Sequence, residues 1–308
     1  MINEQLQPDQ LHKYGWDFRQ TKATPTEATF ALLALRGTAD EVLEATLYGP
    51  FCKFSNTLPY KIPLRRVKSP ISWVGIVTDV CYWTPNLPLQ YRLTVKVRLA
   101  GTLETRDLTI WVALKRFGIK GQALSLDGER YVLRAYATRG LELAASDDEA
   151  WKMLREQRAA LICEELDPAL MLRAGWMGIP VFWDRRDREL SFDMLWAARS
   201  YPALHGVLVD EGKLYDKSLH QGDSLLWIVA RGVLEEGQPP KFEANEPALL
   251  ALLVERARLA RVSMYSELPL LIAEQLDAQT KLADRRQSCD ALQAATAESG
   301  SYAGYLLL

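Results

Sequence analysis

The first third of the chain shows the two-residue alternation of apolar and polar side chains that is typical of β-strands. In residues 91–99 (YRLTVKVRL), an apolar residue occupies every second position and charged or hydroxyl residues lie between them. Similar short runs predict strands at residues 29–36, 41–47, 73–80, 91–99 and 108–114. Prolines and glycines separate these runs, so we expect an antiparallel β-sandwich over residues 25–118, after an N-terminal extension of residues 1–24.

After about residue 120, short apolar runs alternate with helical segments. Strands are predicted at residues 131–138, 160–164, 180–184, 204–209, 225–230, 241–244, 269–273 and 302–307, and helices at 148–159, 168–176, 191–199, 247–260 and 277–298. Eight strands with helices between them indicate a compact (β/α)8 barrel over residues 119–308. An open, doubly wound sheet is the alternative, although no G-x-G-x-x-G or P-loop sequence follows any predicted strand.

Composition and charge exclude several classes of function. The 308 residues include 37 basic and 39 acidic side chains, and 48% of the residues are hydrophobic. A chain without a basic excess or a polybasic run is not expected to bind nucleic acid or an anionic membrane. The N-terminus has no apolar signal region and the chain has no long apolar segment, so we expect a cytoplasmic protein without a transmembrane helix.

The cysteines and histidines give no metal or cofactor signature. Cys52, Cys81, Cys163 and Cys289 lie far apart in the sequence, and the chain has only three histidines. This spacing matches no zinc motif, so we expect free thiols, no metal and no cofactor. A disulfide between Cys52 and Cys81 is the alternative, because both lie in the predicted β-sandwich.

Four short motifs in order resemble glycoside hydrolases of family 2, the β-galactosidase and β-glucuronidase group. They are CYWTPNLPLQY at 81–91, RFGI at 116–119, LSLDGERYVL at 124–133 and WMGIPVFWD at 176–184. The resemblance implies an immunoglobulin-like sandwich that leads into a (β/α)8 barrel. Independently of the family, the Asp127–Gly128 pair is typical of a type I′ hairpin turn.

The resemblance also implies a pair of catalytic carboxylates. Family members are retaining hydrolases, in which an acid/base and a nucleophile lie about 5–5.5 Å apart. Residues 201–212 resemble the segment of the fourth strand that carries the acid/base, and they place Glu211 in that role. Residues 268–275 (LPLLIAEQ) resemble the segment of the seventh strand that carries the nucleophile, and they place Glu274 there.

Further residues at predicted strand ends are candidates for substrate binding. Asp210 stands where the family has an asparagine that contacts a sugar hydroxyl. Glu164, Asp184 and Trp183 end the second and third predicted strands, and a barrel enzyme has its active site at the carboxyl ends of its strands. Each has a plainer explanation, since a carboxylate is also a common surface or ion-pairing residue and a tryptophan is also a common core residue. Glu211 and Glu274 have the same alternative, as residues of a surface turn and of a loop.

Two functions remain open from the sequence. One is a glycoside hydrolase that cleaves O-glycosidic bonds through Glu211 and Glu274. The other is a catalytically inactive, hydrolase-like module that binds carbohydrate or another protein. Three departures from the family pattern fit either a diverged hydrolase or a barrel that has lost catalysis: Asp210 in place of asparagine, no arginine at the end of the second strand and no tryptophan in the eighth. Carbohydrate is a candidate partner in both cases, and the sequence does not define an oligomeric state.

Overall fold

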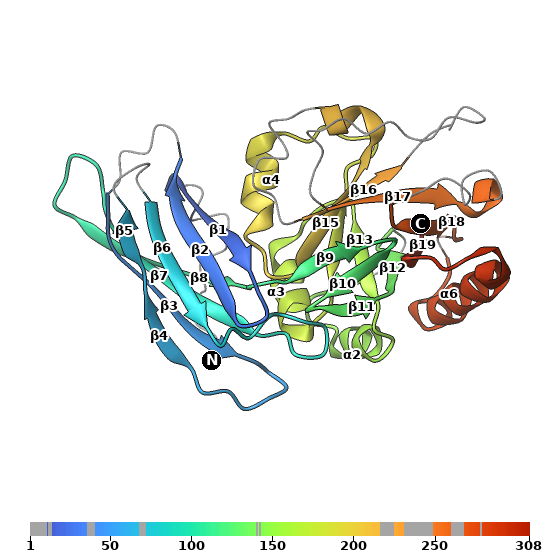
Figure 1. The fold of residues 1–308 in the computed structure, drawn as a ribbon, viewed down its shortest axis with the longest axis horizontal. Helices are drawn as coiled ribbons and strands as arrows, with labels where there is room; N and C mark the ends of the chain where they lie inside the picture. Colours follow the sequence, from blue (N-terminus) through green and yellow to red (C-terminus); the bar gives the residue numbers. More distant parts are fainter. Residues whose placement is uncertain are drawn as a thin grey trace. The chain divides into compact units, whose positions relative to one another are not determined.

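The computed structural model describes residues 11, 14–35, 41–67, 72–139, 141, 143–215, 225–230, 249–259, 268–277 and 279–308. The chain divides into two compact units. One comprises Met1–Arg116 with Phe192–Pro202, and the other comprises Phe117–Ser191 with Ala203–Leu308. The first unit is built mainly from β-strands, and the second contains a barrel (Figure 1).

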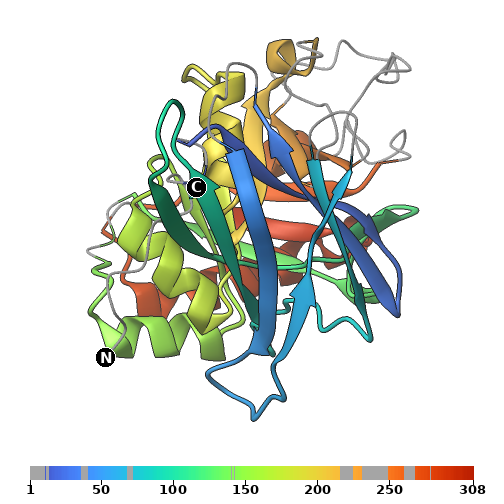
Figure 2. The ribbon, with the colours of Figure 1, turned by 90° about the vertical axis from the view of Figure 1, so that its left-hand side faces the viewer.

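The first unit contains two four-stranded antiparallel sheets (Figures 1 and 2). One sheet has the order β1-β2-β6-β5 and the other has the order β4-β3-β7-β8. The strands are β1 (Trp16–Ala23), β2 (Glu27–Ala34), β3 (Glu41–Phe51), β4 (Tyr60–Pro63), β5 (Arg65–Val67), β6 (Ser72–Thr78), β7 (Gln90–Arg98) and β8 (Thr105–Val112). The immunoglobulin-like sandwich expected from the sequence is therefore confirmed.

The core of the sandwich follows from the alternation along its strands. In β7, Leu93, Val95 and Val97 are fully buried, whereas the residues between them are more exposed. They pack in one cluster with apolar side chains of the other strands, including Trp16 and Phe18 of β1. The first sheet thus includes β1, within the segment expected as an extension, because these two aromatic side chains join the core. The limits 25–118 and 119–308 remain a prediction for the domain boundaries.

A three-stranded antiparallel sheet begins the second unit. It is formed by β9 (Phe117–Lys120), β10 (Ala123–Leu126) and β11 (Glu129–Tyr131). Between β10 and β11, Asp127 and Gly128 have φ angles of 52° and 86°, which confirms the predicted type I′ hairpin. Leu124 belongs to the barrel core cluster, so this sheet contributes to that core.

Eight parallel strands close the barrel in the second unit. Each strand pairs with the next, and the first, β12, also pairs with the last, β19. The strands are β12 (Leu133–Ala137), β13 (Ala160–Cys163), β14 (Val181–Asp184), β15 (Leu204–Asp210), β16 (Leu226–Ala230), β17 (Leu250–Glu255), β18 (Leu270–Glu274) and β19 (Gly304–Leu307). The closed order confirms the compact barrel and excludes the open sheet.

The connections of the barrel are short helices. They are α2 (Asp148–Glu156), α3 (Pro168–Met177), α4 (Phe192–Arg199) and α6 (Leu282–Thr296), with the 3-10 turns η1 (Glu211–Tyr215), η2 (Arg256–Arg258) and η3 (Ala297–Ser299). Asp147 and Asp167 cap α2 and α3 by accepting hydrogen bonds from backbone N–H groups of the first turn. Within the described residues, we find no helix with both the length and the apolar character needed to cross a lipid bilayer.

The interior of the barrel is filled by every second side chain of the strands. These inward residues form one buried cluster that includes Leu133, Ala135, Ala160, Ile162, Phe182, Leu208, Leu226, Ile228, Ala251, Leu253, Leu271, Ala273 and Leu306. Because side chains alternate between the two faces of a strand, this cluster also identifies which strand-end residues face the barrel mouth. The next inward positions are residues 137, 164, 184, 210, 230, 255, 275 and 308.

The sixth strand of the barrel differs from the prediction. The sequence predicts a helix over residues 247–260, but Leu250–Glu255 forms β17 between β16 and β18. The run is rich in leucine and alanine, which favour helices, and burial of both faces hides the alternation of a strand. The helix prediction was therefore wrong here, and the strand predicted at 241–244 lies outside the described residues. Helix α6 begins at Leu282 rather than at residue 277.

Gly206 of β15 tests how tightly the barrel interior is packed. A Cβ atom at Gly206 would lie 2.4 Å from the carbonyl oxygen of Leu226 and 2.8 Å from a ring carbon of Phe182. We expect Gly206→Ala to lower the free energy of unfolding by about 1–3 kcal/mol through overpacking, measured by urea denaturation. Gly212→Ala is the matched control, because a Cβ atom there meets no atom within 4 Å. Equal stability of the two variants would contradict this packing.

None of the four cysteines forms a disulfide, so the alternative of a Cys52–Cys81 disulfide is excluded. Burial raises the pKa of the Cys163 thiol to about 12 and that of Cys289 to about 11, whereas Cys52 and Cys81 are half-buried. Since the thiolate is the reactive form, we expect a thiol reagent at pH 8 to label two cysteines rapidly in the native protein and four after denaturation. Rapid native labelling of Cys163, detected by peptide mapping, would be inconsistent with this burial.

Candidate functional site

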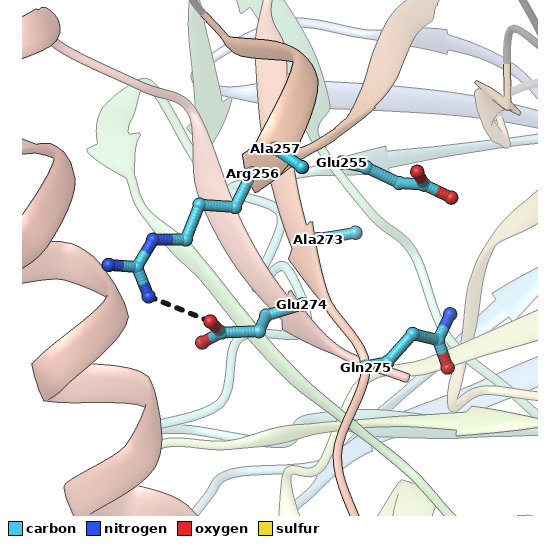
Figure 3. Close-up of a pocket in the computed structure, with 6 residues that line it drawn as sticks. All are labelled: Glu255, Arg256, Ala257, Ala273, Glu274 and Gln275. Atoms are coloured by element: carbon cyan, nitrogen blue, oxygen red, sulfur yellow. Dashed lines mark hydrogen bonds and ion pairs between the residues drawn. The ribbon is translucent and has the colours of Figure 1, made fainter.

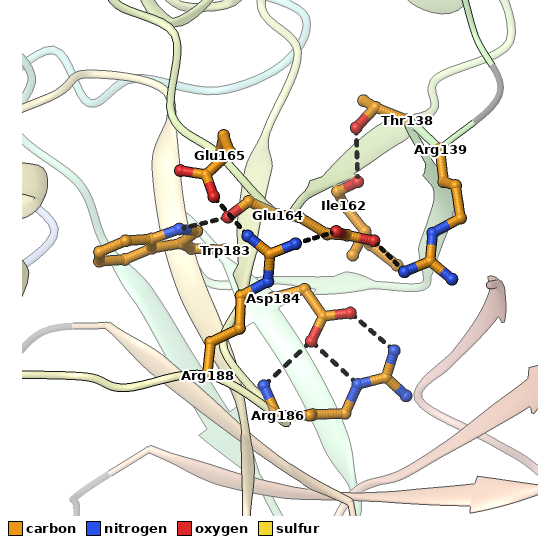
Figure 4. A network of polar contacts seen from close by, with 9 residues as sticks. All are labelled: Thr138, Arg139, Ile162, Glu164, Glu165, Trp183, Asp184, Arg186 and Arg188. Atoms are coloured by element: carbon orange, nitrogen blue, oxygen red, sulfur yellow. Dashed lines mark hydrogen bonds and ion pairs between the residues drawn. The ribbon is translucent and has the colours of Figure 1, made fainter.

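Charged side chains surround a cavity at the carboxyl ends of the barrel strands. The cavity has a volume of about 440 Å³ and is lined by Ala137, Arg139, Ile162, Glu164, Asp184, Arg186, Asp187, Arg188, Gln275 and Leu308. Five of the eight inward positions identified from the strand alternation, residues 137, 164, 184, 275 and 308, are in this lining. The lining therefore offers both carboxylates and guanidinium groups from several strand ends, as Figure 4 shows.

Glu164 lies between two arginines from different loops. Its carboxylate pairs with Arg139 at 2.5 Å, after β12, and with Arg188 at 2.5 Å, after β14. Arg188 also pairs with the neighbouring carboxylate of Glu165, so its guanidinium group bridges two acids (Figure 4). Glu164 thus faces the mouth as the alternation requires, and the pairs connect the loops that follow the first three barrel strands.

Asp184 is held by the arginine two residues after it. The Arg186 guanidinium donates from Nε at 2.9 Å and from Nη2 at 2.6 Å, and the Arg186 backbone N–H donates to the same carboxylate at 3.2 Å. These side-chain hydrogen bonds raise the pKa of Arg186, which remains a cation. Two parallel bonds fix both groups in one plane, so Asp184 presents a carboxylate of fixed orientation at the cavity wall.

Trp183 lies beside the cavity without lining it. The residue is only 5% exposed, and its indole N–H donates to the backbone carbonyl of Glu164 at 3.2 Å. The guanidinium carbon of Arg185 lies 4.9 Å from the centre of the indole ring. These contacts place Trp183 in the packing between two strand ends, and its role in substrate binding stays a prediction.

Asp210 ends the fourth barrel strand and pairs with a lysine of η1. Lys213 Nζ donates to the Asp210 carboxylate at 2.9 Å and to the backbone carbonyls of Arg185 and Arg186. This ammonium group therefore ties the end of the fourth strand to the loop after the third. Asp210 occupies an inward position, and Glu211 is the first residue of η1.

Glu274 ends the seventh barrel strand, and its side chain leaves the strand on the outer side. Leu271 and Ala273 belong to the barrel core, so alternation directs Glu274 away from the barrel axis and Gln275 toward it. Arg256 donates to the Glu274 carboxylate at 2.7 Å. Figure 3 shows Glu274 and Arg256 on one side of their strands and Glu255 and Gln275 on the other.

The structure therefore separates the residues predicted for the site. Glu164 and Asp184 lie together in the lining of the mouth cavity, whereas neither Glu211 nor Glu274 is part of that lining. Glu274 contributes to a second cavity of about 440 Å³, together with Glu255, Arg256, Ala257, Ala273 and Gln275 (Figure 3). In the described residues, no group of three or more histidine, cysteine or acidic side chains has an arrangement that would hold a metal ion.

Sequence reasoning missed the cations of the site. Arg139, Arg188, Lys213 and Arg256 each follow the end of a barrel strand by one to four residues. The sequence does show a basic residue at this spacing after these strands. In three of the four cases, however, its acidic partner follows or ends another strand, so the pair cannot be found from local sequence. Arg256 places an arginine beside the seventh strand, although the second strand lacks the one expected from the family pattern.

Comparison with known proteins identifies the fold. No protein-family model matches the sequence, and no curated protein matches it. Among solved structures, the β-glucuronidase of Bacteroides uniformis aligns with a TM-score of 0.63 and 13% identity, over 95% of this chain and 45% of that chain. A Parabacteroides merdae β-glucuronidase gives 0.59 and 9% over 95% and 46%, and a glycosyl hydrolase family 2 member of Bacteroides cellulosilyticus gives 0.59 and 10% over 96% and 45%.

These similarities confirm the resemblance to glycoside hydrolases of family 2 at the level of the fold. The chain shares with those enzymes a fold of β-sheet domain and eight-stranded parallel barrel, and it spans about half of their length. At 9–13% identity the similarity describes architecture and does not by itself assign chemistry.

The Asp184–Arg186 pair gives a test of the cavity wall. Its two side chains are 14% and 24% exposed, so Asp184→Asn leaves a largely buried guanidinium group without its counter-charge. We expect a loss of about 1–3 kcal/mol in the free energy of unfolding, measured by chemical denaturation. Asp290→Asn is the matched control, because Asp290 and Arg286 form the same kind of pair on exposed helix surface, where the expected loss is below about 0.5 kcal/mol.

Proposed function

We propose that this glycoside hydrolase-like protein binds carbohydrate at the barrel mouth without hydrolysing it. The observation that carries the proposal is the direction of the Glu274 side chain, which leaves the seventh strand on the side away from the barrel axis. In a retaining hydrolase, both carboxyl groups must flank the anomeric carbon of one bound sugar. The inward position at the end of the seventh strand is held by Gln275, whose neutral amide is not a nucleophile.

The lining of the mouth cavity supports carbohydrate as the ligand. It carries three arginines and three carboxylates, so its charges balance within a volume of about 440 Å³. Sugar hydroxyls both donate and accept hydrogen bonds, and such a lining offers charged partners for both roles. The solved structures of similar fold include β-glucuronidases. As part of the proposal, we extend carbohydrate as the ligand class to this chain.

A retaining glycoside hydrolase is the second candidate, and one observation favours it. Glu211 follows the fourth barrel strand and Glu274 ends the seventh, which are the places that the family resemblance implies. Arg256 also donates a hydrogen bond to the Glu274 carboxylate at 2.7 Å. In this alternative, Glu274 is the nucleophile, Glu211 is the acid/base, and Glu164, Asp184 and Asp210 contact the sugar.

Covalent trapping separates the two candidates. A structure of the B. uniformis β-glucuronidase 2 is covalently bound to cyclophellitol-6-carboxylate aziridine, so this reagent is a suitable probe for a retaining nucleophile. We expect intact-mass spectrometry to detect no adduct on the full chain. We also expect the wild type and Glu274→Gln to show the same background rate of hydrolysis of nitrophenyl β-glucuronide and β-galactoside. Glu298→Gln, an exposed acid on η3, is the matched control for the charge change. An adduct that Glu274→Gln removes and Glu298→Gln retains would establish the hydrolase instead.

Ligand binding by the same protein is tested separately. We expect glucuronic acid or galactose oligosaccharides to raise the melting temperature of the wild type, because a ligand that binds only the folded state stabilises it. Arg139→Gln removes an exposed guanidinium donor from the cavity lining and should weaken binding about tenfold in calorimetry. Absence of any thermal shift with these sugars, together with absence of turnover, would overturn the proposal.

A further inference from the structure

The outer face of the β4-β3-β7-β8 sheet carries polar side chains in ordered rows. The strand register places Lys61, Tyr48, Arg92 and Trp111 side by side across the four strands. The next row contains Thr46, Thr94 and Thr109, and the third contains Glu44, Lys96 and Asp107. The side chains between these positions, such as Leu47 and Leu93, point to the sandwich core, so the rows lie on the opposite face.

The first and third of these rows differ in their balance of charges. Lys96 lies opposite Glu44 on β3 and opposite Asp107 on β8, so the third row supplies its own counter-charges. Lys61 and Arg92 lie on either side of Tyr48, and among the described residues neither forms an ion pair with an acid. Arg92 instead stacks on the Tyr48 ring, with 5.3 Å between guanidinium carbon and ring centre. The first row is therefore complementary to an anionic group.

The side chains of these rows line a cavity on the outer face of the sheet. It has a volume of about 660 Å³ and is lined by Glu44, Thr46, Tyr48, Lys61, Arg92, Thr94, Lys96 and Asp107. The size lies in the range of small-molecule binding sites. All eight side chains come from the same sheet, whose strands are joined by antiparallel ladders, so the strand register sets the backbone positions that carry the cations and hydroxyls.

The chemistry of this surface fits a sugar acid better than an acidic peptide. A peptide that adds to a sheet binds at a strand edge through backbone hydrogen bonds, whereas this cavity lies on a sheet face whose backbone groups are already paired. The threonine hydroxyls both donate and accept hydrogen bonds, as sugar hydroxyls do; the Thr94 and Thr109 hydroxyl oxygens lie 3.5 Å apart. The cations beside them match carboxylate groups along the same ligand.

We propose that the outer face of the β4-β3-β7-β8 sheet binds an anionic polysaccharide through Lys61 and Arg92, with the row of threonines contacting its hydroxyl groups. This site is formed by the first unit alone, and it is independent of the barrel mouth. The proposal therefore does not depend on whether the barrel binds or cleaves a sugar.

The experiment measures binding of the full chain to polygalacturonate by affinity electrophoresis and calorimetry at low salt. We expect binding by the wild type, and binding about tenfold to a hundredfold weaker by the double variant Lys61→Gln/Arg92→Gln. Lys22→Gln/Arg65→Gln removes the same charge from the other sheet and is the matched control. It should bind as the wild type does. Added salt should weaken binding by the wild type more than binding by the Lys61/Arg92 variant.

Three probes make each outcome decisive. Fully methyl-esterified polygalacturonate keeps the sugar and removes its charge, and poly-glutamate keeps the charge and removes the sugar. The proposal requires weaker binding of both than of polygalacturonate. No binding of polygalacturonate by the wild type, equal binding of poly-glutamate, or equal losses in the two double variants would each overturn it. Because the variants lie on exposed sheet positions, circular dichroism should show an unchanged fold in all of them.

Discussion

The alternation of side chains along the closed barrel strands determines which residues can reach the mouth. Once β12 pairs with β19, all eight strands have one inward face, and the buried cluster fixes which residues occupy it. The final inward residues of five strands line the mouth cavity, and the residue next to each points to the outer layer. At the end of the seventh strand this places Gln275 at the cavity and Glu274 against Arg256. A shift of one residue in that strand would exchange the two side chains, and with them the chemistry.

Three acids at the ends of the barrel strands have basic partners at the mouth. Glu164 contacts two arginines, Asp184 receives two parallel bonds from Arg186, and Asp210 contacts Lys213. These contacts give each carboxylate a cationic partner and a fixed position at the strand ends. Such an arrangement favours fixed recognition of polar groups. Proton transfer by a carboxyl group instead requires one member of a pair to remain protonated.

The two units offer polar surfaces of different kinds. The barrel mouth balances three arginines with three carboxylates in one cavity, whereas the outer face of the β4-β3-β7-β8 sheet leaves Lys61 and Arg92 without an acidic neighbour across the strands. A balanced lining is suited to neutral hydroxyl groups, and an unbalanced row is suited to carboxylates. The two proposed sites therefore differ in charge preference, although sugars are the ligand class in both.

The sequence by itself determined the architecture of this protein, because the two kinds of hydrophobic period and the Asp127–Gly128 turn are local properties. Alternation predicted β7 to within one residue, and short apolar runs predicted seven of the eight barrel strands. The run at Leu250–Glu255 was misread, since a strand buried on both faces has no alternation and its leucines favour a helix. Only the tertiary structure decided the site. The direction of Glu274 depends on the register of β18 between its neighbours, and the partners of Glu164 come from loops more than twenty residues before and after it in the sequence. Local sequence does not contain that register or those partners, because both arise from closure of the barrel.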